Sequence, residues 1–531
     1  MSKETGNNND SENTDKQTGK EKLSRRSVIK GLAGVGVLGA LGVLSFEKHS
    51  NQPEKVVDLT GKLGLTDAPY IKKSTSGENK DLLRIGIIGF GLRARQLSKA
   101  LGYMHPEKMS EAKKNETLED WLEQENLNVS INGFCEVFED HANYAFEILK
   151  NEEQPGGGAN LKLPIKRYKT YQELLESNEI DAVIIASPEH HHAQMTIDAV
   201  KAGKHVYCEK SFTRTLQEVY DVYDIVKNSD IKFQLGHQIS QSVAFQKAKQ
   251  AVANNLLGKI NLVETTTNRN SPSGAWIRHF QSDGTVKPGN INNIDWKQWL
   301  GNRPEVPFDI KRFYNWSLYQ DYGTGILGQL FTHEFDAVNQ LLEIGIPKSV
   351  VSSGGIYIYK DFREFPDVIQ SIFEYPERDL TLMYSASLGS SNYRGRVFMG
   401  TDAKMELGGK VNITADNSSL KYKTMIEEGL TNSNSPMFTY PKEEGIDGVS
   451  SATAQYYAQR GLIDTKIGGR VIDITHLHLK EWIDAIRNNG DGKLTANIDK
   501  AFEEGITTQM AHISYMEKRR VEWDPINRKV I

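Results

Sequence analysis

The stretch RIGIIGFGLRA, residues 84–94, places three glycines inside an apolar run. The apolar residues before Gly89 predict a buried strand, and LRARQLSKAL after it predicts a helix. The junction fits the pattern G-x-G-x-x-G/A with Gly89, Phe90, Gly91, Leu92, Arg93 and Ala94. In this pattern the first glycine permits a tight turn, and the second lets the backbone approach a pyrophosphate. The small last residue lets the helix pack on the strand. The stretch therefore predicts a dinucleotide site at a helix N-terminus.

A second apolar run, VSINGFCEV at 129–137, predicts a strand that ends near Glu136. A carboxylate at this place can bind both ribose hydroxyls and repels a 2′-phosphate, so NAD is expected rather than NADP. The spacing from Gly91 exceeds the usual ~20 residues. We attribute the excess to a polar, partly helical insert at 105–128. The alternative is that Glu136 is a solvated strand end.

Three further apolar runs, at 180–188, 205–210 and 231–237, alternate with helical segments. This alternation predicts a doubly wound parallel sheet, whose ligands bind at the carboxyl ends of the strands. The candidate cofactor-binding residues at those ends are Glu136, Ser187, Pro188, Glu209, Lys210, His237 and Gln238.

The composition of the 531-residue chain is that of a soluble globular protein with two or more domains. Its formal charge of −5, from 64 basic and 69 acidic residues, gives no support for a nucleic-acid partner. Two cysteines are too few for a secreted disulfide scaffold. Cys135 and Cys208 end two strands that are not expected to be neighbours, so we expect no bridge between them.

The first 46 residues are expected to combine a polar, disordered start with a targeting segment. SRRSVIK at 24–30 precedes 16 uncharged residues at 31–46, too few for a membrane span. The adjacent arginines resemble the twin-arginine signal, so export to the periplasm or cell envelope is expected. A short N-terminal anchor with accidental arginines is the alternative. No clear cleavage site follows, so an uncleaved segment could tether the protein to the membrane, and residues 47–81 are expected to be a linker.

SPEHHHAQMTIDAVKAGKHVYCEKSFTRT resembles the TPxxxH…AGKHVxxEKP signature of the Gfo/Idh/MocA oxidoreductases. The resemblance extends over about residues 82–531 and includes HLHLKEWIDAIRNNG and RRVEWDP near the C-terminus. It implies a Rossmann domain at 82–238, followed at 239–531 by an α/β domain with a mixed, largely antiparallel sheet. The second domain would supply a sugar site and often an oligomer interface, so we expect a homo-oligomer.

The resemblance assigns Lys210 to the lysine of EKP, where it would contact the substrate hydroxyl and the cofactor. Its charge would favour alkoxide character in the transition state. Ser211 replaces the proline of that motif. GILGQLFTHEFD at 325–336 aligns with G-x-L-x-D-x-G-x-H-x-x-D. His333 thereby takes the place of the family's histidine, where a neutral imidazole can act as base.

Gln329 replaces the aspartate of that second motif. A carboxylate there would stabilise the imidazolium formed on proton removal, whereas glutamine can orient the ring without charge. Three outcomes stay open: a weaker base, compensation by another group such as Asp321 or Tyr322, or a different reaction.

Aromatic and basic residues crowd the segment 295–325, which is expected to form a loop over the cleft. The candidate sugar contacts are Trp299, Arg312, Trp316 and Tyr322, and plain domain packing is the alternative. No metal site is expected at His190, His191 and His192, because successive residues point in different directions and the resemblance places His192 near the cofactor. We expect His476 and His478 to serve packing.

Export would remove the protein from any pool of NAD, so a bound cofactor must return to its starting state in each cycle. We therefore expect an exported NAD(P)-dependent sugar oxidoreductase with a tightly bound, internally recycled cofactor. A redox-neutral NAD-dependent glycosidase or lyase, working by transient oxidation and elimination, is the alternative. A non-catalytic sugar-binding protein is the third hypothesis.

Overall fold

The computed structural model describes residues 59–65, 81–156, 163–271, 274–278, 289–392, 394–408, 410–440, 464–467, 469–488 and 494–531. The twin-arginine segment and most of the expected linker lie outside these residues.

The nucleotide-binding half is built on a six-stranded parallel sheet with the order β3-β2-β1-β4-β5-β6. Its strands are β1 (Leu83–Ile88), β2 (Val129–Cys135), β3 (Lys166–Tyr168), β4 (Ala182–Ile185), β5 (His205–Cys208) and β6 (Phe233–Leu235). The predicted doubly wound parallel sheet is confirmed, with five strands in the expected runs. β3 was not predicted, because three residues with only Tyr168 buried give no apolar period.

Two layers of helices cover this sheet, as apolar strands buried on both faces require. Helices α3 (Leu92–Ala100) and α6 (Glu139–Leu149) pack on one face, where Ile85 and Ile87 share a core with Ala94 and Leu97. The other face is covered by α7 (Tyr171–Leu175), α8 (Glu189–Lys201) and α9 (Leu216–Lys227). The expected insert forms α4 (Pro106–Lys114) and α5 (Leu118–Leu122).

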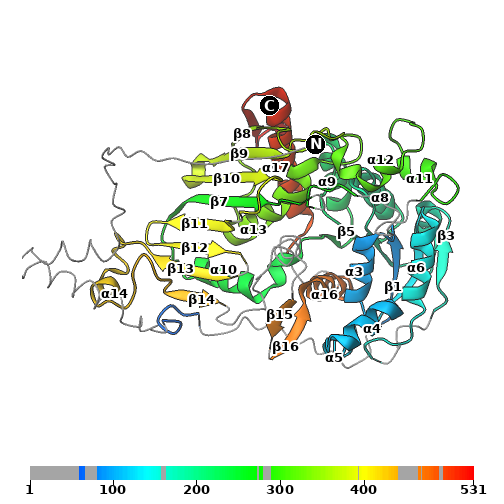
Figure 1. The fold of residues 1–531 in the computed structure, drawn as a ribbon, viewed down its shortest axis with the longest axis horizontal. Coiled ribbons are helices and arrows are strands. Elements are labelled where there is room, and N and C mark those ends of the chain that lie inside the picture. Colours follow the sequence, from blue (N-terminus) through cyan, green and yellow to red (C-terminus); the bar gives the residue numbers. More distant parts are fainter. Residues whose placement is uncertain are drawn as a thin grey trace, which may run out of the picture. The chain divides into compact units, whose positions relative to one another are not determined.

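The C-terminal half holds a ten-stranded sheet with the order β14-β13-β12-β11-β7-β10-β9-β8-β17-β18 (Figure 1). Its strands are β7 (Ile260–Asn268), β8 (Ser349–Gly355), β9 (Val368–Tyr375), β10 (Leu380–Ser387), β11 (Arg396–Gly400), β12 (Ala403–Leu407), β13 (Val411–Ala415), β14 (Phe438–Tyr440), β17 (Val521–Asp524) and β18 (Lys529–Val530). β7 and β10 run parallel, whereas the other neighbouring strands run antiparallel. This confirms the predicted mixed, largely antiparallel sheet.

The remaining elements lie between the strands of the two sheets or follow them in the chain. They are η2 (Gln238–Gln241), α10 (Val243–Ala253), α11 (Trp296–Leu300), α12 (Ile310–Tyr314), η3 (Trp316–Leu318), the short π-helix η4 (Leu327–Phe331), α13 (Thr332–Leu342), η5 (Pro376–Arg378), α14 (Lys423–Glu427), α16 (Ile474–Arg487) and α17 (Ile498–Glu517). A small hairpin of β15 (Asp464–Ile467) and β16 (Arg470–Asp473) precedes α16. Phe331 stacks on Phe373 of β9 with ring centroids 4.6 Å apart, which anchors η4 to the sheet.

Two segments pack far from their sequence neighbours. Helix α16 returns to the nucleotide-binding half, where Trp482 and Ile483 join the core of α3 and β1. The turn at 59–65 buries Leu59, Leu63 and Leu65 in the other core. The Lys247 ammonium of α10 donates to the Leu65 carbonyl at 2.7 Å, so this turn is held against the C-terminal half.

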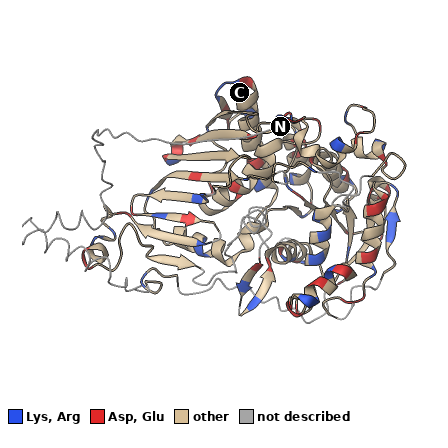
Figure 2. Cartoon of the chain, in the orientation of Figure 1, with Lys and Arg blue, Asp and Glu red and all other residues tan. Residues whose placement is uncertain are grey.

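Charged residues of both signs are interspersed over the described elements (Figure 2). Within the described part of the chain, no helix is both long and apolar enough to span a membrane. Both cysteines are buried and free, as expected from their separation in the sheet order.

Candidate functional site

The glycine-rich turn connects β1 to α3 at the carboxyl end of the sheet. Gly89 has φ +81°, and a β-carbon on it would lie 3.0 Å from the Ser187 nitrogen. A β-carbon on Gly91 would meet nothing within 4 Å. Gly91 is also the N-cap of α3, so no side chain caps the first N–H groups of the helix. An anion such as a pyrophosphate fits there, whereas a side chain at position 91 would fill the space.

Glu136 follows β2 and reaches across to this turn. Its two carboxylate oxygens accept the Phe90 N–H at 2.5 Å and the Phe138 N–H at 2.8 Å. His141 Nδ1 lies 3.8 Å from Oε2. Burial alone would raise the pKa of Glu136, but His141 and the two backbone N–H groups lower it below its usual range. The carboxylate is therefore ionised, oriented and ready to accept ribose hydroxyls.

Arg93 and Glu209 form a largely buried ion pair at the same end of the sheet. Arg93 Nε lies 2.8 Å from Glu209 Oε1. Gly236 leaves room for this carboxylate, because a β-carbon there would lie 2.7 Å from Oε1. The pair links α3 to the end of β5 and thereby holds the glycine turn in place.

A cavity of about 510 Å³ joins these groups to the candidate catalytic residues. The residues predicted from the sequence that line it are Gly89, Gly91, Leu92, Arg93, Glu136, Ser187, Pro188, Glu209, Lys210, Trp299, Trp316, Gln329 and His333. A nucleotide site and a substrate site are thus parts of one continuous cavity.

Lys210 follows β5, and its peptide bond to Ser211 is cis. Lys210 Nζ donates to Gln329 Oε1 at 2.9 Å. The other end of the Gln329 amide donates to the Glu189 carboxylate. Gln329 lies in the short π-helix η4, a feature often found at functional sites. Its amide therefore bridges the nucleotide-binding half and the C-terminal half.

His333 lines the cavity from the first turn of α13, and a buried His–Glu pair lies behind it. The rings of His237 and His333 meet edge to face with centroids 5.2 Å apart. His237 Nε2 lies 2.6 Å from Glu504 Oε2. Burial opposes a charge on His237, but Glu504 and Asp336 raise its pKa.

Seven predicted residues do not line the cavity: Phe90, Ala94, His192, His237, Gln238, Arg312 and Tyr322. The first five are buried. Phe90 contributes its N–H to Glu136, Ala94 packs α3 on the sheet, and Gln238 donates to the Tyr207 hydroxyl at 2.7 Å. Arg312 lies over the Tyr319 ring at 4.5 Å, and the Tyr322 side chain is fully buried. Asp321 is not among the residues that line the cavity either.

The three successive histidines of α8 point at backbone carbonyls. His190 Nε2 and His191 Nε2 each lie 2.8 Å from the Trp299 oxygen. His192 Nδ1 lies 2.7 Å from the Ser211 oxygen, and its Nε2 lies 3.0 Å from the Ser187 oxygen. His192 thus ties the end of β4 to the turn after β5, beside the cofactor cavity. No group of three metal-ligating side chains is found among the described residues.

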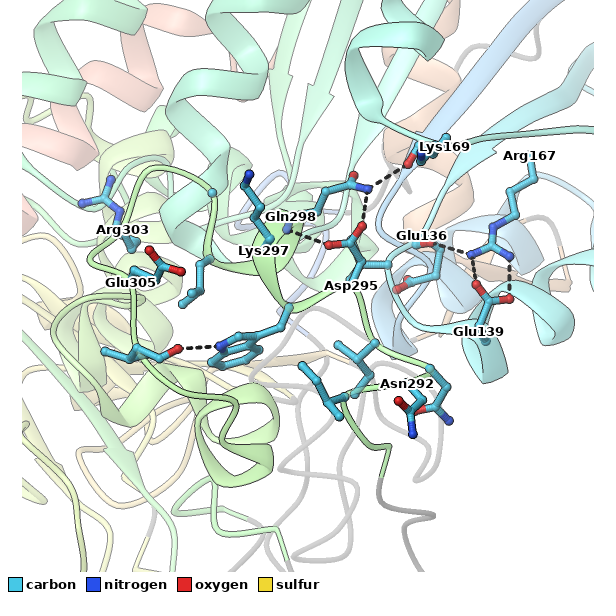
Figure 3. A pocket seen from close by; sticks show the side chains of 18 residues that line it. Glu136, Glu139, Arg167, Lys169, Asn292, Asp295, Lys297, Gln298, Arg303 and Glu305 are labelled. Atoms are coloured by element: carbon cyan, nitrogen blue, oxygen red, sulfur yellow. Dashed lines mark hydrogen bonds and ion pairs between the residues drawn. The ribbon is translucent and has the colours of Figure 1, made fainter.

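Residues 290–301, which we call the clasp, are bonded to the strand ends of the nucleotide-binding half. The Asp295 N–H donates to the Val137 carbonyl at 2.8 Å, and the Glu139 N–H donates to the Asn293 carbonyl at 2.9 Å. Gln298 Nε2 donates to the Lys169 carbonyl at 3.0 Å (Figure 3).

The clasp borders a second, open cavity of about 1060 Å³, which shares Glu136, Val137 and Gln298 with the first one. In Figure 3, Arg167 and Glu139 lie side by side in the lining of this cavity and form an ion pair, with Nη2 and Oε1 2.6 Å apart. The clasp therefore separates the two cavities beside Glu136.

Several lining residues were missed by sequence reasoning: Arg95, His141, Tyr171, His191, Trp276, Arg278 and Tyr314. His191 was considered from the sequence only as a metal ligand, and that interpretation was discounted. Glu189 was also missed, because its partners Thr324 and Gln329 are more than 130 residues away.

Residues 83–237 match the model of the Gfo/Idh/MocA oxidoreductases, an oxidoreductase family with an NAD-binding Rossmann fold. The nucleotide-binding half is thus similar to the Rossmann domain of this family. This likeness agrees with two features of the site: the glycine turn after β1, and the carboxylate of Glu136 held at the end of β2.

Individual relatives extend this likeness. Levoglucosan dehydrogenase of Pseudarthrobacter phenanthrenivorans is 27% identical over 196 residues, which are 35% of this chain and 41% of the relative. 2,7-Anhydro-N-acetylneuraminate hydratase of Escherichia coli is 26% identical over 158 residues, 29% of this chain and 42% of the relative. The chain thus matches less than half the length of these curated relatives.

A solved structure covers more of the fold. A levoglucosan dehydrogenase in complex with NADH and levoglucosan superimposes with a TM-score of 0.53 at 15% identity. The superposition spans 83% of this chain and 99% of that one, so the two-part fold is shared.

Proposed function

We propose that the protein is an exported, NAD-dependent oxidoreductase that acts on a sugar or sugar derivative and keeps its cofactor through the cycle. The observation that carries the proposal is the single cavity that joins the glycine turn and Glu136 to Lys210 and His333. The names of the relatives, a levoglucosan dehydrogenase and an anhydro-sugar hydratase, support a carbohydrate substrate.

The cofactor site fits NAD by the chemistry of its own groups. The open N-terminus of α3 at Gly91 suits the pyrophosphate, and Glu136 suits the ribose hydroxyls and disfavours a 2′-phosphate. NAD would supply a hydride acceptor. The protein would then supply a cation, Lys210, to stabilise oxyanion character on the substrate, and His333 to take the hydroxyl proton.

Tight retention of the cofactor is supported by the clasp. Its backbone bonds to Val137 and Glu139 lie directly beside Glu136, and its Trp299 carbonyl accepts two histidine N–H groups of α8. Opening this edge of the cavity breaks several hydrogen bonds at once, so release of a nucleotide would be slow.

Retention also keeps the redox-neutral glycosidase as the second candidate, because that chemistry returns the cofactor to its starting state. The anhydro-sugar hydratase among the relatives favours it. The non-catalytic sugar-binding protein is disfavoured, because Lys210 and His333 both reach the cavity.

Export remains part of the proposal and depends on the twin-arginine segment at 24–30. The twin-arginine route carries folded proteins, so it would allow the cofactor to be acquired first. A fusion of residues 1–58 to a reporter that folds in the cytoplasm tests this, with Arg25→Lys/Arg26→Lys as control. A reporter exported equally well by both sequences would contradict the proposed route.

We extend the proposal to a homo-oligomer in which a second copy covers an exposed row of the large sheet. Val351, Ile372 and Met383 are neighbours across β8, β9 and β10 and are 37%, 42% and 38% exposed. An exposed apolar row of this kind can pack on its own copy across a two-fold axis. Light scattering should show an oligomer that Ile372→Asp dissociates, and a monomeric wild type would overturn this part.

The direct test of function begins with denaturation of the purified protein and identification of the released nucleotide by mass spectrometry. Near-stoichiometric NAD or NADH supports a retained cofactor. Absorbance at 340 nm with candidate sugars then follows hydride transfer in the wild type and in Lys210→Ala, with the exposed Lys201→Ala as control. Unchanged turnover in Lys210→Ala, or an empty protein that fails to bind added NAD, would overturn the proposal.

A further inference from the structure

Glu189 is a buried carboxylate that the proposed chemistry does not use. It is the first residue of α8 and is 0% exposed. The Ser211 hydroxyl donates to its Oε1 at 2.9 Å, and the Thr324 hydroxyl donates to its Oε2 at 2.7 Å. The Gln329 amide is a third donor to Oε1. Three donors converge on the two oxygens of Glu189, and an ionised carboxylate, which only accepts, suits this arrangement best. We therefore take Glu189 as a negative charge in the interior.

This charge decides which way the Gln329 amide faces. An ammonium has only donors, and a carboxylate has only acceptors. The amide must therefore turn its oxygen to Lys210 and its NH₂ group to Glu189, as observed. The reversed amide would set NH₂ against an ammonium and oxygen against a carboxylate, which is unfavourable at both ends.

We propose that Glu189 is a positioning residue for Lys210. Its carboxylate fixes the Gln329 amide, whose oxygen holds the Lys210 ammonium at the cavity wall, and it carries the negative charge that Gln329 itself lacks. The inference rests on the proposed function only in that Lys210 is taken to serve hydride transfer.

Other charged groups surround Lys210 from several elements, and most have partners of their own. Glu209 pairs with Arg93, and Glu504 of α17 pairs with His237, while His333 of α13 shares the cavity wall. The Glu189 charge also acts on His192 of its own helix and on Arg214, and it reaches Lys210 through one amide.

The test measures the pH at which Lys210 becomes reactive. The full-length protein is acetylated briefly with acetic anhydride over a pH series, and mass spectrometry follows the peptide that contains Lys210. Glu189→Gln should lower the midpoint of Lys210 acetylation by about one pH unit, because a nearby negative charge is lost. Glu218→Gln removes a neighbouring hydrogen-bonded carboxylate of α9 without a bond to Gln329, and should leave the midpoint unchanged.

The decisive variant exchanges the two groups. Glu189→Gln/Gln329→Glu keeps net charge and side-chain volume, and puts the carboxylate in direct contact with Lys210. Its midpoint should return to the wild-type value or rise above it. The inference would be overturned if Glu189→Gln left the acetylation midpoint of Lys210 unchanged. It would also be overturned if the double variant failed to restore the wild-type midpoint.

If Glu189→Gln does not fold, the single variant Gln329→Glu is compared instead with the double variant Glu189→Gln/Gln329→Glu. The single variant retains both carboxylates and should show the higher midpoint, whereas equal midpoints would overturn the inference. The measurement needs neither NAD nor a sugar, so its result is independent of whether the protein transfers hydride.

Discussion

The backbone of Gly89 lies directly against that of Ser187, where a β-carbon would come within 3.0 Å of the Ser187 nitrogen. This contact joins the ends of β1 and β4, the two central strands of the nucleotide sheet. The positive φ of Gly89 adds a second constraint, since L side chains rarely adopt it. Two residues on, Gly91 faces open space. The two glycines of the motif therefore have separable roles, one in folding and one in binding.

Replacement of each glycine by alanine should separate these roles. Gly89→Ala should lower the free energy of unfolding by about 1–3 kcal/mol, because both the φ and the contact are incompatible with a β-carbon. Gly91→Ala should unfold like the wild type when both are freed of nucleotide. It should retain at least about tenfold less nucleotide, since the new methyl fills the anion site. Thermal unfolding and mass spectrometry of released nucleotide check the pair. A Gly91→Ala protein with full nucleotide content would contradict the assignment of this turn.

Glu136 should set the preference for NAD over NADP. The ionised carboxylate repels a 2′-phosphate, so Glu136→Ser should reduce the NAD:NADP affinity ratio by about tenfold or more. Because Glu136 also accepts two backbone N–H groups, the protein should lose some stability. Fluorescence titration with NADH and NADPH, on protein freed of bound nucleotide, measures the ratio. Glu136→Gln separates charge from shape, and an unchanged ratio in both variants would assign Glu136 a structural role only.

The nucleotide half could be predicted from the sequence because its signals are local. Strands such as Ala182–Ile185 are continuous apolar runs, and the glycine turn and Glu136 adjoin them in the chain. The edge strand β3 carries no such run and was missed. The return of α16 to this half was not foreseeable either, because Trp482 meets Tyr207 from 275 positions away, with ring centroids 5.7 Å apart.

The candidate site was predictable only where a residue follows a strand or stands in a motif. Lys210 and His333 were found in this way. The compensation for Gln329 was sought in Asp321 and Tyr322, its neighbours in the chain, whereas the structure bonds Gln329 to Glu189 of α8. Trp299 was expected at the substrate, and it does reach the cavity, but its carbonyl also accepts from two histidines. Hydrogen bonds between residues so far apart in the chain leave no periodic signal in a sequence.

The clasp should control how fast nucleotide leaves. Gln298→Ala removes the bonds to the Lys169 carbonyl and to Asp295, and the Gln298 side chain lines both cavities. Release of bound nucleotide, followed by exchange against labelled NAD, should accelerate by about fivefold or more, in line with the loss of roughly 1 kcal/mol per hydrogen bond. Gln217→Ala, which removes an exposed bond to Asp221 on α9, is the matched control. Equal rates in both variants would show that the clasp does not retain the cofactor.

His192 should make the stability of the protein depend on pH. Its two ring nitrogens face the carbonyls of Ser187 and Ser211, which can only accept, so both nitrogens carry protons. Burial opposes this charge, but Cys208, the Ser211 carbonyl and Glu189 raise the pKa of His192 to about 9.

Since this folded-state pKa lies above the unfolded value of ~6.5, the stabilisation is complete below about pH 6.5 and is lost as the pH rises to about 9. Urea unfolding should show wild type losing about 2–3 kcal/mol over this window, and His192→Asn losing much less. His191→Asn is the control. Burial lowers the pKa of His191 to about 4, so this ring stays neutral and its replacement should cost the same free energy throughout the window. Parallel stability curves for the wild type and His192→Asn would mean that the ring between the two carbonyls is neutral, and that one of these hydrogen bonds is not made.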